Sequence, residues 1–240
     1  MGDAVVVDAG YQDPFVFRDR REAGRALAAA VQRLPDLRRP IVLALPRGGV
    51  PVGFEVARLL HAPLDVLVVR KLGTPGQEEL AMGAVAYGNA IYLNRTLIEA
   101  LRIPQQVVDA TQAREMEEVA RRTLRYRGDR PLPDLAARSV IAVDDGAATG
   151  ATAEAAMKAL RGQHPAEIVL ALPVAPADTL ALLRAVADRV VCLRAPEPFF
   201  AIGEWYLDFT QVSDEEVRSL LDGAGAWAEV AEEVPTPPMG

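Results

Sequence analysis

The chain has very few of the residues that build disulfide frameworks or zinc sites. Its 240 residues include one cysteine, Cys192, and two histidines, His61 and His164. A single cysteine cannot form a disulfide within the chain, and no Cys/His spacing typical of a zinc site is present. Cys192 lies in the segment 189–193, which is apolar after Arg189 and predicts a buried strand residue rather than a catalytic thiol.

Long apolar runs, a leader segment and an excess of basic residues are also missing. No apolar stretch reaches the roughly 20 residues of a membrane-spanning helix, and the N-terminus does not show a basic-then-apolar signal layout. The net charge of −7 argues against binding nucleic acid through a broad basic face. We therefore expect a cytoplasmic protein without a membrane or nucleic-acid partner.

Helical and extended patterns alternate along the chain. The spacing of Asp19 and Glu22 predicts a capping box that opens the first helix. The predicted strands are short and uniformly apolar, which favours an α/β fold with a mostly parallel sheet covered by helices on both faces. Strands are predicted at 41–45, 64–69, 140–143, 167–172 and 189–193, a hairpin at 82–87 and 90–93, and further helices at 51–60, 95–101, 104–126, 153–160 and 177–187.

The most informative stretch is 140–152. Four apolar residues lead into Asp144 and Asp145, and a loop of small residues with two threonines then opens a helix. Unpaired amides and the positive end of the helix dipole form a phosphate site at such a terminus, and small residues let an anion approach the backbone. Two carboxylates next to a phosphate site predict a sugar phosphate as the ligand. The predicted phosphate-binding residues are Ala148, Thr149, Gly150, Ala151 and Thr152.

Two further strand ends are basic. The strand 41–45 runs into Arg47 flanked by Gly48 and Gly49, and the strand 64–69 runs into Arg70 and Lys71. Either loop alone is more often solvated surface. Because the carboxyl ends of parallel strands meet at one edge of the sheet, the three loops together suit one pyrophosphate and one 5′-phosphate around a ribose.

The stretch 140–152 closely resembles the phosphoribosyl-pyrophosphate motif of type I phosphoribosyltransferases, in which a hydrophobic strand, two acids and a Thr-Gly-x-Thr loop follow one another. The resemblance covers roughly residues 15–220 and is weakest near the end of that range, at 199–209. It implies displacement of pyrophosphate from C1 of phosphoribosyl pyrophosphate by a nitrogen nucleophile, with Mg²⁺ as cofactor. The acceptor it implies is a purine-like base, and it implies a homodimer.

The resemblance also implies roles for particular residues. Asp144 and Asp145 orient the ribose hydroxyls and hold Mg²⁺ mainly through those hydroxyls or water, and the loop from Ala148 to Thr152 holds the 5′-phosphate. The residues implied in catalysis are Asp144, Asp145, Arg47 and Lys71. The pyrophosphate-binding residues are Arg47, Gly48, Gly49, Arg70 and Lys71.

The same resemblance implies a cis peptide bond, a closing lid and a hood over the base. The peptide bond between Arg47 and Gly48 is expected to be cis, and residues 71–90 are expected to form a closing lid, with Glu78 or Glu79 as a guess for the general base. Residues 199–209 resemble the hood that holds the base in purine enzymes, although a hydrophobic lid packed on the core fits them equally well. The expected base-binding residues are Phe200, Ile202 and Asp208.

We expect a single domain at 1–228. Its core covers about 15–195, and a hood covers about 196–222 together with the N-terminal segment. Residues 229–240 contain Pro235, Pro237 and Pro238 and are predicted to be a disordered tail.

The acceptor and the activity itself remain open. Many enzymes that act on 6-oxopurines carry an Asp where this chain has Ala148, which argues against hypoxanthine or guanine. A non-catalytic protein that binds phosphoribosyl pyrophosphate or a nucleotide is the main alternative. A dinucleotide-binding oxidoreductase is a third, but the required glycine fingerprint after the first strand is missing.

Overall fold

The computed structural model describes residues 16–86, 88, 90–128, 130 and 133–232. Its centre is a parallel five-stranded sheet in the order β2-β1-β6-β7-β8. The chain steps outward from β1 to β2 and in the opposite direction from β6 to β8, so the order reverses between β1 and β6. The predicted α/β class is confirmed. The strands are β1 (Ile41–Ala44), β2 (Leu64–Val66), β6 (Ser139–Val143), β7 (Glu167–Val174) and β8 (Arg189–Arg194).

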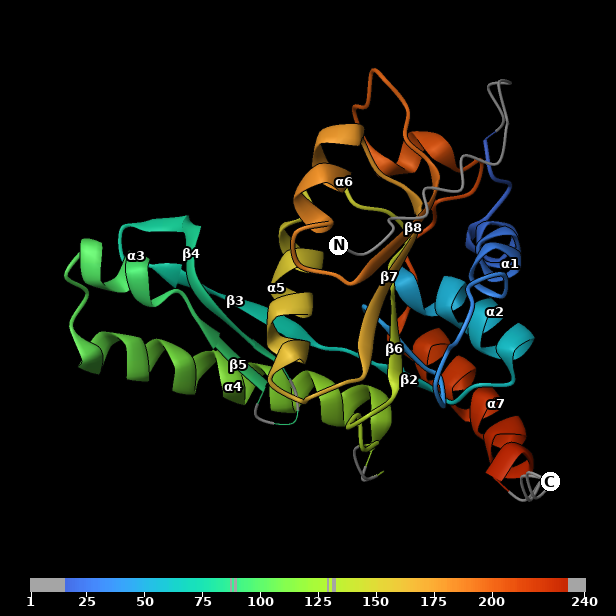
Figure 1. Ribbon diagram of the computed structural model, residues 1–240, viewed down its shortest axis with the longest axis horizontal. Helices are drawn as coiled ribbons and strands as arrows, with labels where there is room; N and C mark the ends of the chain where they lie inside the picture. Colours follow the sequence, from blue (N-terminus) through green and yellow to red (C-terminus); the bar gives the residue numbers. More distant parts are fainter. Residues whose placement is uncertain (1–15, 87, 89, 129, 131–132, 233–240) are drawn as a thin grey trace.

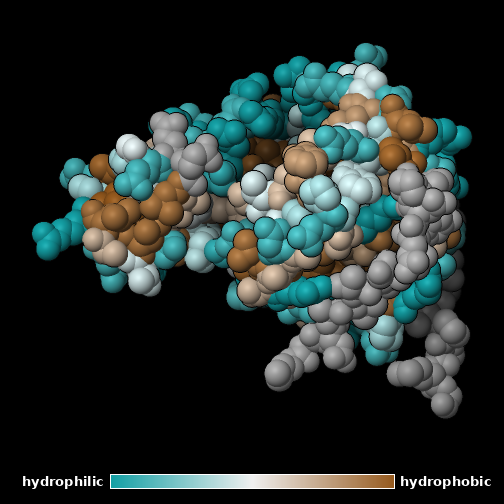
Figure 2. Space-filling model, turned by 90° about the horizontal axis from the view of Figure 1, so that it is seen from above, coloured by the Kyte–Doolittle hydropathy of each residue, from teal (hydrophilic) through white to brown (hydrophobic). Residues whose placement is uncertain are grey.

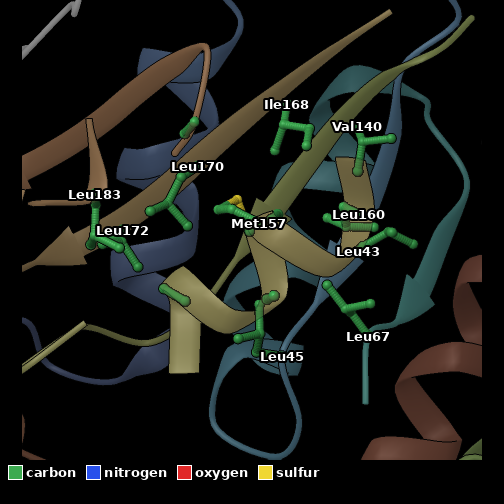
Figure 3. Close-up of a cluster of buried hydrophobic side chains, with 14 of the residues drawn as sticks. Leu43, Leu45, Leu67, Val140, Met157, Leu160, Ile168, Leu170, Leu172 and Leu183 are labelled. Carbon is green, nitrogen blue, oxygen red and sulfur yellow. The ribbon is translucent and has the colours of Figure 1, made fainter. Parts of the chain in front are cut away.

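Helices cover both faces of this sheet (Figure 1). Successive strand residues point to opposite faces, so Val42, Ile141 and Val169 pack toward α1 (Arg20–Val31) and α2 (Gly49–Leu60). Their neighbours form the second core layer under α5 (Ala151–Arg161) and α6 (Ala177–Leu183), shown in Figure 3. That layer includes Leu43, Val140, Met157, Leu160 and Ile168. These two apolar layers explain why the strands carry no polar alternation.

Cys192 is a core residue, as predicted. It is buried in β8 as a free cysteine, and burial raises the pKa of its thiol to about 11. A thiol that holds its proton at neutral pH is a poor nucleophile. The residue therefore contributes packing.

A second sheet carries the chain away from the core. The antiparallel strands β3 (Val69–Thr74), β4 (Gln77–Ala86) and β5 (Ala90–Leu93) pair in that order. With α3 (Arg95–Ala100) and α4 (Gln105–Arg127) they form an arm, residues 69–127, that extends to the left in Figure 1. The predicted hairpin at 82–93 is confirmed, although β4 begins at Gln77, and Tyr87 and Asn89 lie outside the described residues. Figure 2 shows apolar side chains gathered at the free end of the arm.

The prediction of one strand at 64–69 is wrong. β2 ends at Val66, and β3 begins at Val69 in the other sheet. Leu67 and Val68 are buried, one in the core layer under α5 and the other in the cluster between the arm and α7. The apolar run continues through the connection because the connection itself is buried, and this burial imitates a longer strand.

The last helix, α7 (Asp214–Glu232), was not predicted. Its start carries ordinary signals, since Ser213 Oγ accepts from the amide of Glu216 and the first turn holds three acids. Val217 and Leu221 pack on the arm and the β2 edge. Residues 229–232 of the predicted tail thus belong to a helix, and residues 233–240 lie outside the described part of the chain. Within the described residues, no helix has the length and apolar character of a membrane span.

Helix α1 packs on α2 so closely at Gly24 that there is no room for a side chain. This packing gives the first prediction. A Cβ atom on Gly24 would lie 2.9 Å from the carbonyl oxygen of Val52. We expect Gly24→Ala to destabilise the fold by about 1–3 kcal/mol, because overpacking outweighs the helix propensity of alanine. Urea denaturation measures the change.

The matched control is Gly225→Ala on α7, where an added Cβ meets no atom within 4 Å. This variant should gain about 0.5–1 kcal/mol from propensity alone. A Gly24→Ala protein as stable as the wild type would contradict the close packing of α1 on α2.

Candidate active site

The site forms at the carboxyl end of β6, beside the point where the strand order reverses. The buried strand residue Val143 is followed by Asp144, which is half-buried, and Asp145, which is buried. Open α/β sheets bind ligands at this position. The acid pair therefore lies where the fold places a ligand.

The glycines of the 46–49 loop pack directly on the acid pair. A Cβ atom on Gly48 would lie 2.0 Å from Oδ2 of Asp145, and one on Gly49 would lie 2.6 Å from the carbonyl oxygen of Val143. Both positions exclude any side chain. The loop expected to hold pyrophosphate thus lies against the acids expected to hold ribose.

The cis peptide bond of this loop joins Pro46 to Arg47. The expected position between Arg47 and Gly48 is wrong by one residue. Gly48 already has helical dihedral angles, φ −61° and ψ −34°, as the cap of α2.

The two acids differ in their partners. Nε of Arg20 donates to Oδ2 of Asp145 at 2.7 Å, and both side chains are nearly buried. Asp144 accepts from the amide of Asp145, and burial together with the neighbouring carboxylate raises the pKa of Asp144 well above its ordinary value. One acid is thereby neutralised by an arginine, while the other holds its proton more tightly than a free aspartate.

Segment 199–210 also contacts the acid pair. Tyr206 donates its hydroxyl to the backbone carbonyl of Asp145 and stacks on Phe209, with ring centroids 5.0 Å apart. Burial, reinforced by the charge of Asp145, raises the pKa of Tyr206, so the hydroxyl stays a donor. Neither Tyr206 nor Arg20 was among the predicted site residues.

The predicted phosphate loop is partly exposed to solvent and is held in place by a hydrogen bond from α6. Ala148 and Thr149 are exposed, and the hydroxyl of Thr179 donates to the carbonyl of Ala148 at 2.7 Å. Gly150 caps α5 with φ +71°, a left-handed conformation that glycine adopts readily. The first helical hydrogen bond is donated by the amide of Glu154, so the amides of residues 151–153 precede the helical ladder. The amide of Ala151 donates to Oγ1 of Thr149 at the long distance of 3.4 Å. Amides in this position can bind an anion.

The basic residues expected to bind pyrophosphate are engaged within the protein. Arg47 forms a 3.6 Å ion pair with Asp214 at the start of α7, and Arg125 and Tyr126 of α4 contact the same carboxylate. Arg70 donates to the buried Glu115 at 2.9 Å. Asp214, the ion-pair partner of Arg47, was not among the site residues predicted from the sequence.

Lys71 lies near the predicted phosphate loop. It lines a pocket of about 250 Å³ between β4 and the first turns of α5, together with Ala151, Glu154 and Lys158. The structure thus places Lys71 beside the predicted 5′-phosphate loop. The side chains of Glu78 and Glu79 lie outside the described part of the structure.

The three predicted base-binding residues are spread along segment 199–210. Ile202 lies over the acid loop, where its Cγ2 atom would be 2.8 Å from a Cβ on Gly146. Phe200 is 76% exposed. Asp208 accepts from the amide and hydroxyl of Thr210, and these hydrogen bonds lower the pKa of Asp208. Of the three, only Ile202 is shown in contact with the loop that follows the acid pair.

Fold and site together define an α/β protein with an acid pair at the end of a central strand, close to the N-terminus of a helix. Residues 21–208 match the family model described as phosphoribosyl transferase domain, and the chain belongs to this family.

Related proteins agree with this assignment. Two relatives from Mycobacterium tuberculosis, in strains CDC 1551 and H37Rv, are provisionally named phosphoribosyl transferases and are each 47% identical over 211 residues. The match covers 87% of this chain and 47% of each relative, so the chain spans about half their length. The crystal structure of TT1426 from Thermus thermophilus is 43% identical, with a TM-score of 0.80 over 86% of this chain and 98% of that one.

The raised pKa of Asp144 predicts a stability change in Asp144→Asn. Above about pH 4 an unfolded chain ionises this aspartate freely, while the folded chain resists ionisation, so wild-type stability falls as pH rises through that window. Asparagine keeps the hydrogen bond from the Asp145 amide and cannot ionise. The variant should therefore unfold at a higher temperature than the wild type at pH 7.

Thermal unfolding at a series of pH values tests this expectation. The advantage of Asp144→Asn should shrink toward pH 4 and vanish below it, where both proteins carry a neutral group. Equal stability of the two proteins at pH 7 would show that burial and Asp145 impose no cost on the Asp144 carboxylate.

Proposed function

We propose that the chain transfers the 5-phosphoribosyl group from phosphoribosyl pyrophosphate to a nitrogen heterocycle and releases pyrophosphate. The observation that carries the proposal is the acid pair Asp144 and Asp145, followed after the short loop 146–150 by the N-terminus of α5. A ribose 5-phosphate spans such a pair of subsites, with hydroxyls on the acids and phosphate on the amides.

In this reaction the bond between C1 and the pyrophosphate oxygen breaks, and its electron pair leaves with pyrophosphate. A lone pair on the acceptor nitrogen forms the new bond to C1, and the acceptor nitrogen releases its proton to water. The carboxylates of Asp144 and Asp145 favour the positive charge that develops on the ribose ring. The amides of residues 151–153 fix the 5′-phosphate and thus the position of C1.

Asp144 and Asp145 could contribute ligands to Mg²⁺ but do not form a complete binding site for it. Two adjacent carboxylates are hard oxygen donors of the kind that this ion prefers, but the described residues contain no cluster of three or more metal-binding side chains. Asp144 and Asp145 would therefore hold the ion mainly through ribose hydroxyls or water. Bound Mg²⁺ would neutralise charge on the pyrophosphate group.

The arm supplies the expected lid and part of the leaving-group site. The hairpin of β3 and β4 includes Lys71 and covers most of the predicted lid at 71–90. Arg47 and Arg70 would exchange Asp214 and Glu115 for phosphate oxygens as pyrophosphate binds. Closing the arm over α5 would exclude water from the oxocarbenium-like centre.

A purine-like base is the proposed acceptor, held by segment 199–210 with Phe200, Ile202 and Asp208 as contacts. Ala148 makes a 6-oxopurine the less favoured choice. A cytoplasmic location and a homodimer remain part of the proposal.

The second candidate function is a non-catalytic regulator that binds phosphoribosyl pyrophosphate or a nucleotide. One observation favours it, since Arg47 and Arg70 are both ion-paired within the protein. Calorimetric titration of phosphoribosyl pyrophosphate with Mg²⁺, followed by a pyrophosphate-release screen across nucleobases, separates the two. Binding with base-dependent release supports the transferase, and binding without release supports the regulator.

The acid pair should be required for binding. We expect Asp144→Asn combined with Asp145→Asn to weaken phosphoribosyl pyrophosphate binding at least about 100-fold, because two charge-assisted hydrogen-bond sites are lost. The control is Asp109→Asn with Asp222→Asn, which removes the same charge from exposed positions on α4 and α7. Unchanged affinity in the Asp144/Asp145 variant would refute the site.

A further inference from the structure

Arg20 links three parts of the molecule that are far apart in sequence. Its Nε donates to Oδ2 of Asp145 at 2.7 Å, and its Nη1 donates to the carbonyl of Thr210 at 2.8 Å. Its guanidinium carbon lies 3.9 Å from the centroid of the Phe209 ring. A single side chain on α1 thus contacts the acid pair and segment 199–210 at the same time.

The position of Arg20 is unusual for its residue type. It is the first residue of α1, where the helix dipole disfavours a positive charge. Its side chain is only 11% exposed, and that of Asp145 is 12% exposed. Burying an arginine at this end of a helix is unfavourable unless its partners compensate, and these partners belong to the candidate site.

The backbone around Arg20 is also joined to segment 199–210. The amide of Leu207 donates to the carbonyl of Phe17 at 2.8 Å, and the amide of Asp208 donates to the carbonyl of Arg18 at 2.9 Å. Tyr206 reaches Asp145 directly through its hydroxyl. Segment 199–210 is therefore held between the start of α1 and the acid pair.

We propose that Arg20 is a positioning residue that couples the orientation of Asp145 to the position of segment 199–210. Its fork geometry allows simultaneous donation to a carboxylate and a carbonyl while its flat face rests on an aromatic ring. A lysine cannot make these contacts together. Displacement of the segment breaks the Thr210 and Phe209 contacts and frees the Asp145 carboxylate to turn.

The coupling through Arg20 also affects the reaction and, in that respect, rests on the proposed function. Oδ2 of Asp145 is occupied by Arg20 and packed against Gly48. Ligand contacts then fall to Asp144 and the other oxygen of Asp145. Because segment 199–210 is also the proposed acceptor site, Arg20 makes ribose binding depend on the state of that site.

A first experiment needs no ligand. Hydrogen exchange of the Leu207 and Asp208 amides is compared in the wild type, Arg20→Gln, Asp145→Asn and the double variant. Each single variant should speed exchange at least about tenfold, because a charge-assisted link is lost. The double variant should exchange no faster than the faster single variant, since both changes break one link. Unchanged exchange in Arg20→Gln, or fully additive effects, would overturn the coupling.

The second experiment uses phosphoribosyl pyrophosphate and inorganic pyrophosphate as separate probes, each with Mg²⁺. Arg20→Gln should weaken phosphoribosyl pyrophosphate at least about tenfold and leave inorganic pyrophosphate within about twofold, because Arg20 acts through Asp145 on the ribose. Arg20→Lys should recover only part of the loss. Equal weakening of both probes would indicate a general structural defect and contradict the proposal.

The matched control is Arg25→Gln. Arg25 lies on the same helix and pairs with a buried carboxylate, Glu55, at 3.7 Å, away from the acid pair. The Arg25→Gln variant should leave the exchange of the Leu207 and Asp208 amides and the affinities for both probes unchanged. If the wild type binds neither probe, the proposed function fails, while the exchange experiment still decides whether Arg20 couples the two parts.

Discussion

Two adjacent carboxylates at the end of a central strand impose the main constraint on this structure. Asp144 and Asp145 lie in a partly buried position, where like charges repel and desolvation is costly. Three features of the surroundings offset this cost: Arg20 pairs with Asp145, a backbone amide donates to Asp144, and Gly48 has no side chain that would clash with Asp145. A group arranged at such cost indicates a functional site, since a core built only for stability would hold neutral residues here.

The rest of the molecule is arranged around these acids. β6 places them at the reversal of strand order, α5 begins a few residues later, and α2 brings the glycine loop against them. The arm approaches from the side of α5 through Lys71, and segment 199–210 approaches through Tyr206. β6, the glycine loop and segment 199–210 meet at the acid pair from different parts of the chain, while the arm reaches the start of α5. Bringing distant segments together at strand ends is how an α/β sheet assembles a site.

Patterns confined to one stretch of sequence were predictable, and contacts between distant stretches were not. The acid-tipped strand, the small-residue loop and the parallel sheet follow from local pattern, as does the capping of α1. The link between Arg20 and Asp145 joins residues 125 positions apart, and no period or motif connects them. A basic residue in the first turn of α1 was the available signal. The split at Leu67 and Val68 was missed because burial, not strand geometry, explains their apolar character.

The most direct test of the account is a crystal structure of the protein with phosphoribosyl pyrophosphate and Mg²⁺. We predict the 5′-phosphate within hydrogen-bond reach of the amides of residues 151–153, ribose hydroxyls on Asp144, and Arg20 still bound to Asp145. A phosphate held instead by Lys71 and Lys158 in the pocket beside α5, with the acid pair free of ligand, would contradict the account.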